Sequence, residues 1–133
     1  MKSIHNTPAL SSRNVAEYIS GFVDGEGCFS VSFTKRSRFL LGWETKPSFS
    51  VSQNSDRAQQ LFIMQKHFGC GFMREGKTDK TIKYEIRRLD DLIEKVIPHF
   101  DRYQMLSSKQ QDFESFKKIC LLMKKGEHIT PGG

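Results

Sequence analysis

The stretch that decides the fold runs from Tyr18 to Phe33 and reads YISGFVDGEGCFSVSF. Its first part carries apolar side chains at helical spacing, and its last part alternates apolar with polar side chains, as a half-buried strand does. Between the two parts, Gly25 and Gly27 stand on either side of Glu26. Because glycine disfavours both a helix interior and a strand, the segment predicts a helix that ends, and a strand that begins, around one uncrowded carboxylate.

Outward from this stretch, hydrophobic periodicity predicts a helix and two strands, a second helix and two more strands, and a final helical region. The predicted helices span 12–25, 56–68, 90–97 and 108–125, and the predicted strands span 28–35, 43–53, 72–75 and 81–88. Asp56 is expected to cap the second helix, and Pro98 to interrupt the third. The order αββαββα predicts an α+β domain in which helices cover one face of a four-stranded antiparallel sheet. We expect one domain over 1–133, with an N-terminal arm at 1–11 and a flexible tail at 127–133.

The composition excludes several classes of protein. No apolar run approaches the ~18 residues that a membrane span needs, and the first residues lack the apolar core of a secretory signal. Cys28, Cys70 and Cys120 are an odd number of widely spaced thiols, which argues against a disulfide scaffold and a zinc site. We therefore expect neither secretion nor a membrane partner. The net charge of +6 instead favours an anionic partner.

The open face of the predicted sheet is rich in hydroxyl, ammonium and guanidinium groups. Such groups bind phosphates and the edges of bases, although any antiparallel sheet with one face in water is polar. On strand parity, this concave face predicts a DNA-binding surface. The expected contact residues are Ser30, Ser32, Thr34, Arg36, Arg38, Lys46, Ser48, Ser50, Arg74, Lys83, Glu85 and Arg87. Glu85 is expected either to accept a hydrogen bond from cytosine N4 or to hold a neighbouring basic side chain.

The segment 19–27, ISGFVDGEG, resembles the signature of the LAGLIDADG homing endonucleases. Gly21 matches the helix-packing glycine, Asp24 and Glu26 match the two acids, and Gly27 closes the motif. The resemblance continues through FSVSQ, the FGCGF turn and the late segment LSSKQQDF. It implies that family's αββαββα half-domain and a sequence-specific endonuclease that cuts double-stranded DNA with a staggered break. It also implies a gene located in an organelle, a mitochondrion or a chloroplast.

Only one such motif is present in the sequence. In the family, one-motif chains act as homodimers, so the resemblance implies a homodimer on a palindromic or pseudo-palindromic site. The expected interface is the motif helix, through Ile19, Ser20, Gly21, Val23 and Asp24. Small residues there allow two helices to approach closely and bring two Glu26 carboxylates together. The chain is alternatively one half of a two-motif enzyme, excised or redesigned to pair with itself.

The resemblance also implies the chemistry of the site. Glu26 and the Gly25 carbonyl are expected to hold Mg²⁺, a hard cation that prefers oxygen ligands, and no small-molecule cofactor is expected. Mn²⁺ should substitute for Mg²⁺, and Ca²⁺ should bind without supporting cleavage. Lys109 matches the basic residue at the start of the family's last helix, and Gln53 matches a polar residue that orients water. Arg57 is a weaker candidate for the same network.

Two other functions remain open from the sequence. Relatives of this fold also serve as splicing cofactors of intron RNA, for which cleavage is dispensable. A non-cleaving DNA-binding module with the same fold would need no acid at the end of the motif helix. Retention of Glu26, Gln53 and Lys109 together favours cleavage over both.

Overall fold

The computed structural model of the chain describes residues 12–35 and 43–126. The predicted arm at 1–11, the predicted tail at 127–133 and the loop residues Arg36 and Arg38 lie outside these ranges. Within them, no helix combines the length and the apolar character that crossing a bilayer requires.

The order of the elements matches the predicted one, and the third predicted helix, 90–97, spans residues 89–102 as three consecutive helical segments. In chain order the elements are α2 (Ser12–Glu26), β1 (Gly27–Lys35), β2 (Trp43–Asn54), a 3-10 turn (Ser55–Arg57), α3 (Gln59–Phe68), β3 (Phe72–Glu75), β4 (Thr81–Ile86), α4 (Leu89–Asp91), a π turn (Leu92–Val96), α5 (Ile97–Arg102) and α6 (Lys109–Gly126). The predicted fold class, α+β with one four-stranded antiparallel sheet, is confirmed.

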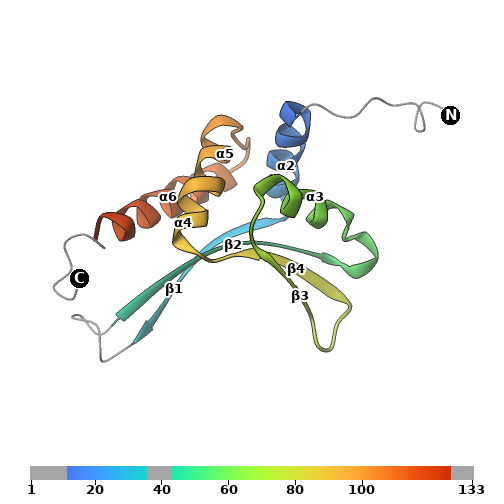
Figure 1. Cartoon of the computed structure of the whole chain (residues 1–133), viewed down its shortest axis with the longest axis horizontal. Coiled ribbons are helices and arrows are strands. Elements are labelled where there is room, and N and C mark those ends of the chain that lie inside the picture. The colour runs from blue at the N-terminus through green and yellow to red at the C-terminus, as the bar shows by residue number, and fades with distance from the viewer. Residues whose placement is uncertain (1–11, 36–42, 127–133) are drawn as a thin grey trace.

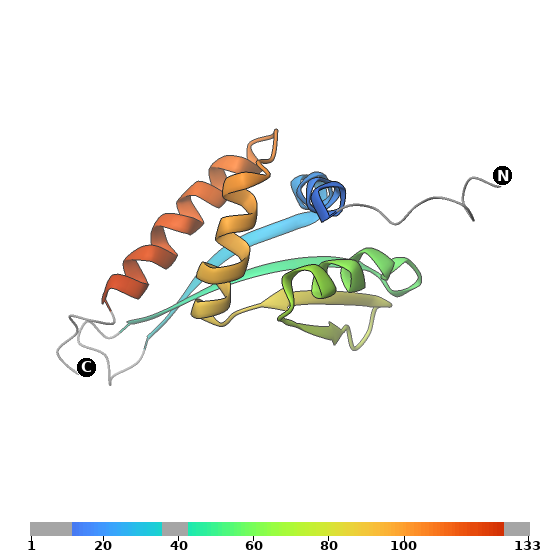
Figure 2. The ribbon, with the colours of Figure 1, turned by 45° about the horizontal axis from the view of Figure 1, so that its top comes forward.

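The four strands form one antiparallel sheet in the order β1-β2-β4-β3. The strands arch, and the helices lie together on the outer side of the arch (Figure 1). Figure 2 shows α5 beside α6 toward one end of the sheet and α3 toward the other, with α2 between them. Among the described residues, no helix lies on the inner side of the arch (Figure 1).

The core lies between the sheet and the helices because side chains alternate along each strand. Phe49, Val51, Tyr84 and Ile86 are at most 1% exposed. Aromatic rings fill the centre: the ring of Phe29 lies 5.2–5.5 Å from those of Phe49, Phe100, Phe113 and Phe116. These contacts join β1 and β2 to α5 and α6, so the position of α6 against the sheet is set by packing.

The turn after α3 requires glycine. Gly69 ends the helix in the left-handed conformation, with φ of 72°, and its N–H donates to the Gln65 carbonyl. Gly71 has φ of 91°, and a Cβ there would lie 2.7 Å from an atom of the Tyr84 ring. The Tyr84 hydroxyl donates a 2.6 Å hydrogen bond to the Cys70 carbonyl, which anchors the turn to β4.

Two helix boundaries differ from the prediction. Pro98 does not interrupt its helix, because it stands in the first turn of α5, where a missing N–H costs no helical hydrogen bond. The preceding π turn, Leu92–Val96, carries the helical path from α4 into α5. Asp56 does not cap α3: it lies within the 3-10 turn, and Ala58 occupies the N-cap position without a side-chain bond.

Candidate active site

Glu26 is the last residue of α2, exposed at the point where the helix passes into β1. The Gln53 side chain donates a 3.3 Å hydrogen bond from Nε2 to Glu26 Oε1. Gln53 follows Phe49 and Val51 on the helix-covered face of β2, where the apolar core ends. The structure thus brings together the predicted acid and the predicted polar partner, which are 27 residues apart in sequence.

Lys109 reaches the same place from the first residue of α6. Its Nζ donates a 2.5 Å hydrogen bond to the carbonyl of Gly27, the residue that follows Glu26. An ammonium group has three N–H donors, so this bond leaves two of them for other acceptors. Glu26, Gln53 and Lys109 therefore converge on the junction between α2 and β1. Arg57 lies exposed in the 3-10 turn after β2.

Asp24 joins this junction to the loop before α6. Its carboxylate accepts hydrogen bonds from the backbone N–H of Leu106, at 3.1 Å, and of Ser107, at 3.2 Å, and a further bond from the Ser107 hydroxyl. These bonds to the charged form, the Ser107 hydroxyl foremost, lower the pKa of Asp24 below its ordinary value. Asp24 was predicted to lie in a subunit interface, but its carboxylate is used inside the chain.

Three other residues of the predicted interface are buried within their own chain. Ile19 and Val23 are 0% exposed and Ser20 is 4% exposed, because they face the core of their own chain. The Ser20 hydroxyl donates a 2.5 Å hydrogen bond to the Tyr103 carbonyl. These side chains have no surface left to offer a partner.

The opposite face of α2 is the open one. Tyr18, Gly21, Phe22 and Gly25 follow each other at helical spacing, and the Tyr18 and Phe22 rings stack with centroids 6.2 Å apart. A Cβ at Gly21 or Gly25 would meet no atom of the described chain within 4 Å. Neither glycine is therefore explained by packing within this chain. The four residues are called the α2 stripe below.

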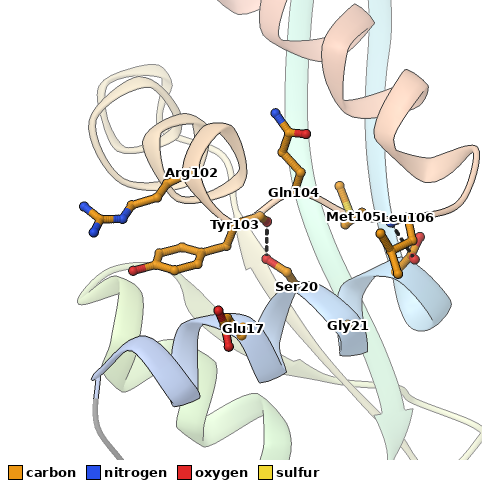
Figure 3. Close-up of a pocket in the computed structure, with 9 residues that line it drawn as sticks. Glu17, Ser20, Gly21, Arg102, Tyr103, Gln104, Met105 and Leu106 are labelled. Carbon is orange, nitrogen blue, oxygen red and sulfur yellow. Dashed lines mark hydrogen bonds between the residues drawn. The ribbon is translucent and has the colours of Figure 1, made fainter.

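A groove of about 460 Å³ runs beside the α2 stripe. It is lined by Glu17, Ser20, Gly21 and Asp24 of α2, by Arg102 at the end of α5 and by residues 103–106 of the loop that follows. Figure 3 shows Ser20 pointing from α2 to the Tyr103 carbonyl at the wall of the groove. At its rim, Leu106 is 97% exposed. Leu106 and Gly21 thus lie on one exposed, partly apolar surface beside α2.

The polar face predicted from strand parity is confirmed by the register. The paired positions place Ser30 opposite Ser48, Ser32 opposite Lys46, and Arg74 opposite Lys83. Serine hydroxyls cross-link the strands, with Ser30 Oγ 3.0 Å from Ser48 Oγ and Ser32 Oγ donating to the Lys46 carbonyl at 3.4 Å. Thr34 pairs through its backbone with Glu44. The side chain of Thr34 lies outside the part that the structure describes.

Two residues of the predicted DNA-contact set are buried. Ser50 is 8% exposed and Glu85 is 4% exposed, because they pair with each other at the centre of the sheet. Glu85 forms ion pairs with Arg74 and Arg87, whose side chains cover it. Of the two expectations for Glu85, the geometry supports the one in which it holds neighbouring basic side chains.

A buried histidine network was missed at the sequence level. His99 Nε2 lies 3.1 Å from Ser20 Oγ, and His99 Nδ1 lies 3.0 Å from His67 Nε2. Since the Ser20 hydroxyl donates to the Tyr103 carbonyl, its oxygen accepts from His99, and His99 in turn accepts from His67. Burial, with a smaller effect of His67, lowers the pKa of His99 to about 4. Only the packing of α3 against α5 reveals this network.

The oxygen atoms at Glu26 can supply part of the coordination shell of a magnesium ion, with water and substrate supplying the rest. The described residues contain no group of three or more His, Cys, Asp or Glu side chains that could hold a metal by themselves. Mg²⁺ typically binds one or two carboxylates and completes its shell with water and substrate phosphate oxygens. An exposed carboxylate beside the Gly25 carbonyl fits that need.

The chain is similar to known proteins over most of its length. Residues 19–120 match the model of the LAGLIDADG endonuclease family. The "Probable intron-encoded endonuclease 2" of Neurospora crassa is 31% identical over 117 residues, which cover 87% of this chain and 26% of the relative. The chain thus spans about a quarter of the length of that relative.

Solved structures share the fold. The crystal structure of the I-LtrWI LAGLIDADG homing endonuclease bound to target DNA is 30% identical, with a TM-score of 0.84 over 91% of this chain and 41% of that one. I-SmaMI, bound to uncleaved DNA in the presence of calcium ions, is 27% identical, with a TM-score of 0.80 over 86% of this chain and 39% of that one. On the family match and these structures, the chain belongs to the LAGLIDADG endonuclease family.

Proposed function

We propose that the protein is a sequence-specific endonuclease that hydrolyses one phosphodiester bond in each strand of double-stranded DNA and leaves a staggered break. The observation that carries this proposal is the convergence of Glu26, Gln53 and Lys109 on the junction between α2 and β1. Relatives with this fold are bound to target DNA. The name of the Neurospora crassa relative supports an intron-encoded origin, and on that basis we propose an organelle gene.

The cofactor of the proposed reaction is Mg²⁺, held by the Glu26 carboxylate and the Gly25 carbonyl, with Mn²⁺ as a substitute. When bound, such a cation neutralises charge on the scissile phosphate and lowers the pKa of the attacking water. Calcium is expected to support binding without cleavage, and uncleaved DNA in the presence of calcium ions in I-SmaMI is in keeping with this.

The side chains of this chain have distinct tasks in the proposed reaction. Gln53 holds the orientation of the Glu26 carboxylate through its amide N–H, and its amide oxygen remains to accept a hydrogen bond from water. Lys109 supplies a fixed positive charge beside the site, and its two remaining N–H groups can donate to phosphate oxygens as negative charge develops.

The protein acts as a homodimer in this proposal, with the α2 stripe as the contact. Close approach of two helices needs small residues, and at Gly21 and Gly25 the described chain leaves the space of a side chain open. An isologous dimer places two copies of Glu26 near one axis and requires a target with matching two-fold symmetry.

The open face of the sheet binds the DNA in this proposal. Arginine and lysine side chains neutralise phosphates and read bases, and serine hydroxyls contact either. The proposed contact residues are Ser30, Ser32, Lys46, Ser48, Arg74, Lys83 and Arg87. Thr34, Arg36 and Arg38 remain predictions from the sequence.

The test selects bound duplexes from a randomised library in Ca²⁺ and then transfers them to Mg²⁺ with native protein or with Glu26→Gln. We expect a symmetric site that both proteins bind and that only the native protein cuts, on both strands. Glu94→Gln, which removes an exposed carboxylate from the π turn, is the matched control and should cut at the native rate. Cleavage by Glu26→Gln at the native rate would contradict the proposal. If the native protein and both variants bind DNA without cleaving it, intron RNA would be tested next as the ligand.

A further inference from the structure

Glu85 is a carboxylate buried on the polar face of the sheet. It lies in β4 between Ser50 of β2 and Phe72 of β3, and its side chain is only 6% exposed. Burying a charged group costs free energy unless opposite charges accompany it. A carboxylate in the middle of the proposed DNA-binding surface therefore needs an explanation.

Two arginines compensate for this burial. Arg74 Nη2 lies 3.0 Å from Glu85 Oε1, and Arg87 Nε lies 3.2 Å from Glu85 Oε2. Both arginine side chains remain about half exposed, at 51% and 54%. Glu85 Oε1 has no aligned hydrogen bond and almost no accessible surface. The contact with Arg74 is therefore mainly Coulombic, and a base amino group cannot reach this oxygen unless Arg74 moves.

Arg87 is fixed by a second contact. Its guanidinium carbon lies 5.7 Å from the centroid of the Phe72 ring, within the range of a cation–π interaction. Nε of Arg87 faces Glu85, and the guanidinium lies over the Phe72 ring. The edge of the guanidinium formed by Nη1 and Nη2 therefore remains available to bind a ligand. This edge matches the O6 and N7 acceptors of guanine in the major groove.

We infer that Glu85 is a positioning residue that holds Arg87, with Arg74 beside it, to recognise one guanine in each half of the target. The inference rests on the proposed function and deepens it, because it assigns one base of the substrate. Because the Arg87 guanidinium is already held in place before DNA binds, less side-chain entropy is lost on binding.

The inference predicts that removing the charge of Glu85 lowers discrimination between base pairs without weakening binding to DNA in general. Removing the negative charge of Glu85 strengthens attraction to every phosphate nearby, so binding to unrelated DNA should not weaken. Discrimination against a changed base pair at the guanine position should fall about 10-fold, the scale on which a well-oriented bidentate contact separates the right base from a wrong one. A residue needed only for folding would weaken binding to all sequences together.

The experiment measures discrimination at each position of the selected duplex, in Ca²⁺, for native protein, Glu85→Gln, Arg87→Ala and the double variant. We expect Glu85→Gln and Arg87→Ala to lower discrimination at the same base pair, and the double variant to resemble Arg87→Ala alone. Glu85→Asp, which keeps the charge, should retain part of the discrimination. Glu75→Gln removes a charge from neighbouring β3 outside the cluster and should leave discrimination unchanged. Thermal unfolding of each variant identifies any that fail to fold.

The outcomes separate this inference from the proposed function. Native protein that selects no sequence would contradict the function itself. Native protein that selects a site at which Glu85→Gln changes nothing would leave the function standing and overturn the inference. A further loss at the same base pair on adding Glu85→Gln to Arg87→Ala would also overturn it, because Glu85 would then act on that base pair by a route other than Arg87.

Discussion

The amide of Gln53 donates a 3.3 Å hydrogen bond to the carboxylate of Glu26, and so joins the end of β2 to the end of α2. A carboxylate at a helix end is otherwise free to rotate. The hydrogen bond selects one orientation and keeps Oε1 directed toward the sheet.

Gln53→Ala should slow cleavage without a matching loss of DNA binding. Partners that orient a metal ligand typically contribute 10- to 100-fold to activity, and we expect a loss of about this size. Single-turnover cleavage in Mg²⁺ and binding in Ca²⁺ measure the two effects separately. Gln53→Glu would place a second carboxylate against Glu26 and should impair cleavage at least as strongly. If both variants cleave DNA at the native rate, Gln53 has no role in the proposed reaction.

Lys109→Met should reduce the cleavage rate about 100-fold, because it removes a fixed positive charge near the reacting phosphate. Methionine retains most of the apolar part of the side chain, so folding should be little changed. Lys118→Met removes an equal charge from an exposed position on the same helix and serves as the control. A loss of similar size in both variants would indicate a general effect of charge.

Gly21→Val should prevent dimerisation while the single chain still folds. A Cβ at Gly21 meets no atom of the described chain within 4 Å, but a valine side chain there would separate two closely packed helices. Sedimentation at micromolar concentration, with and without DNA, should give a dimer for native protein and a monomer for the variant. Gly126→Val, also at an open position, should behave like native protein. A native chain that remains a monomer on DNA would contradict the homodimer and favour half of a two-motif enzyme.

Stability should fall between about pH 6.5 and pH 4 because of His99. Its pKa is lowered from 6.5 to about 4 in the folded chain, so in this range the unfolded chain binds a proton that the folded chain does not. The free energy of unfolding therefore decreases as the pH falls, by up to about 3 kcal/mol for His99 alone. His67, whose pKa is also lowered by burial, adds in the same direction.

Urea unfolding at a series of pH values measures this dependence. His99→Gln cannot titrate, so its stability curve should be flatter than the native one between pH 6.5 and 4. Asp24 and Asp90, whose pKa values lie below the ordinary 3.8, lose their contribution mainly below pH 4 and to the same extent in both proteins. Parallel curves for the native and variant proteins would show that His99 is not the group responsible.

The sheet and its polar face could be predicted because strand parity is a local property. Alternation around Phe29 and Phe49 alone decides which side chains face the helices. The two faces of α2 could not be separated in the same way, because Phe22 and Val23 are both apolar and stand on different faces. Which face is covered depends on α3 and α5, and these arrive later in the chain.

Contacts between distant elements account for the other errors. The burial of Glu85 follows from Arg74, which reaches it diagonally from the neighbouring strand. The contact between His67 and His99 spans 32 residues and depends on how two helices pack. Neither has a signal in the local sequence. By contrast, Gln53 and Lys109 were located from motif resemblance, and the structure places them against Glu26 and the Gly27 carbonyl.

The bonds between Asp24 and the loop at Leu106 and Ser107 also have a consequence for synthesis. Glu26 and Asp24 are synthesised early. The backbone amides that bind Asp24, and Lys109, which binds the Gly27 carbonyl, follow more than 80 residues later. A nascent chain carries Glu26 long before Lys109 has left the ribosome. The proposed site is complete only when α6 packs against β1, so a chain truncated before α6 is expected not to cleave DNA.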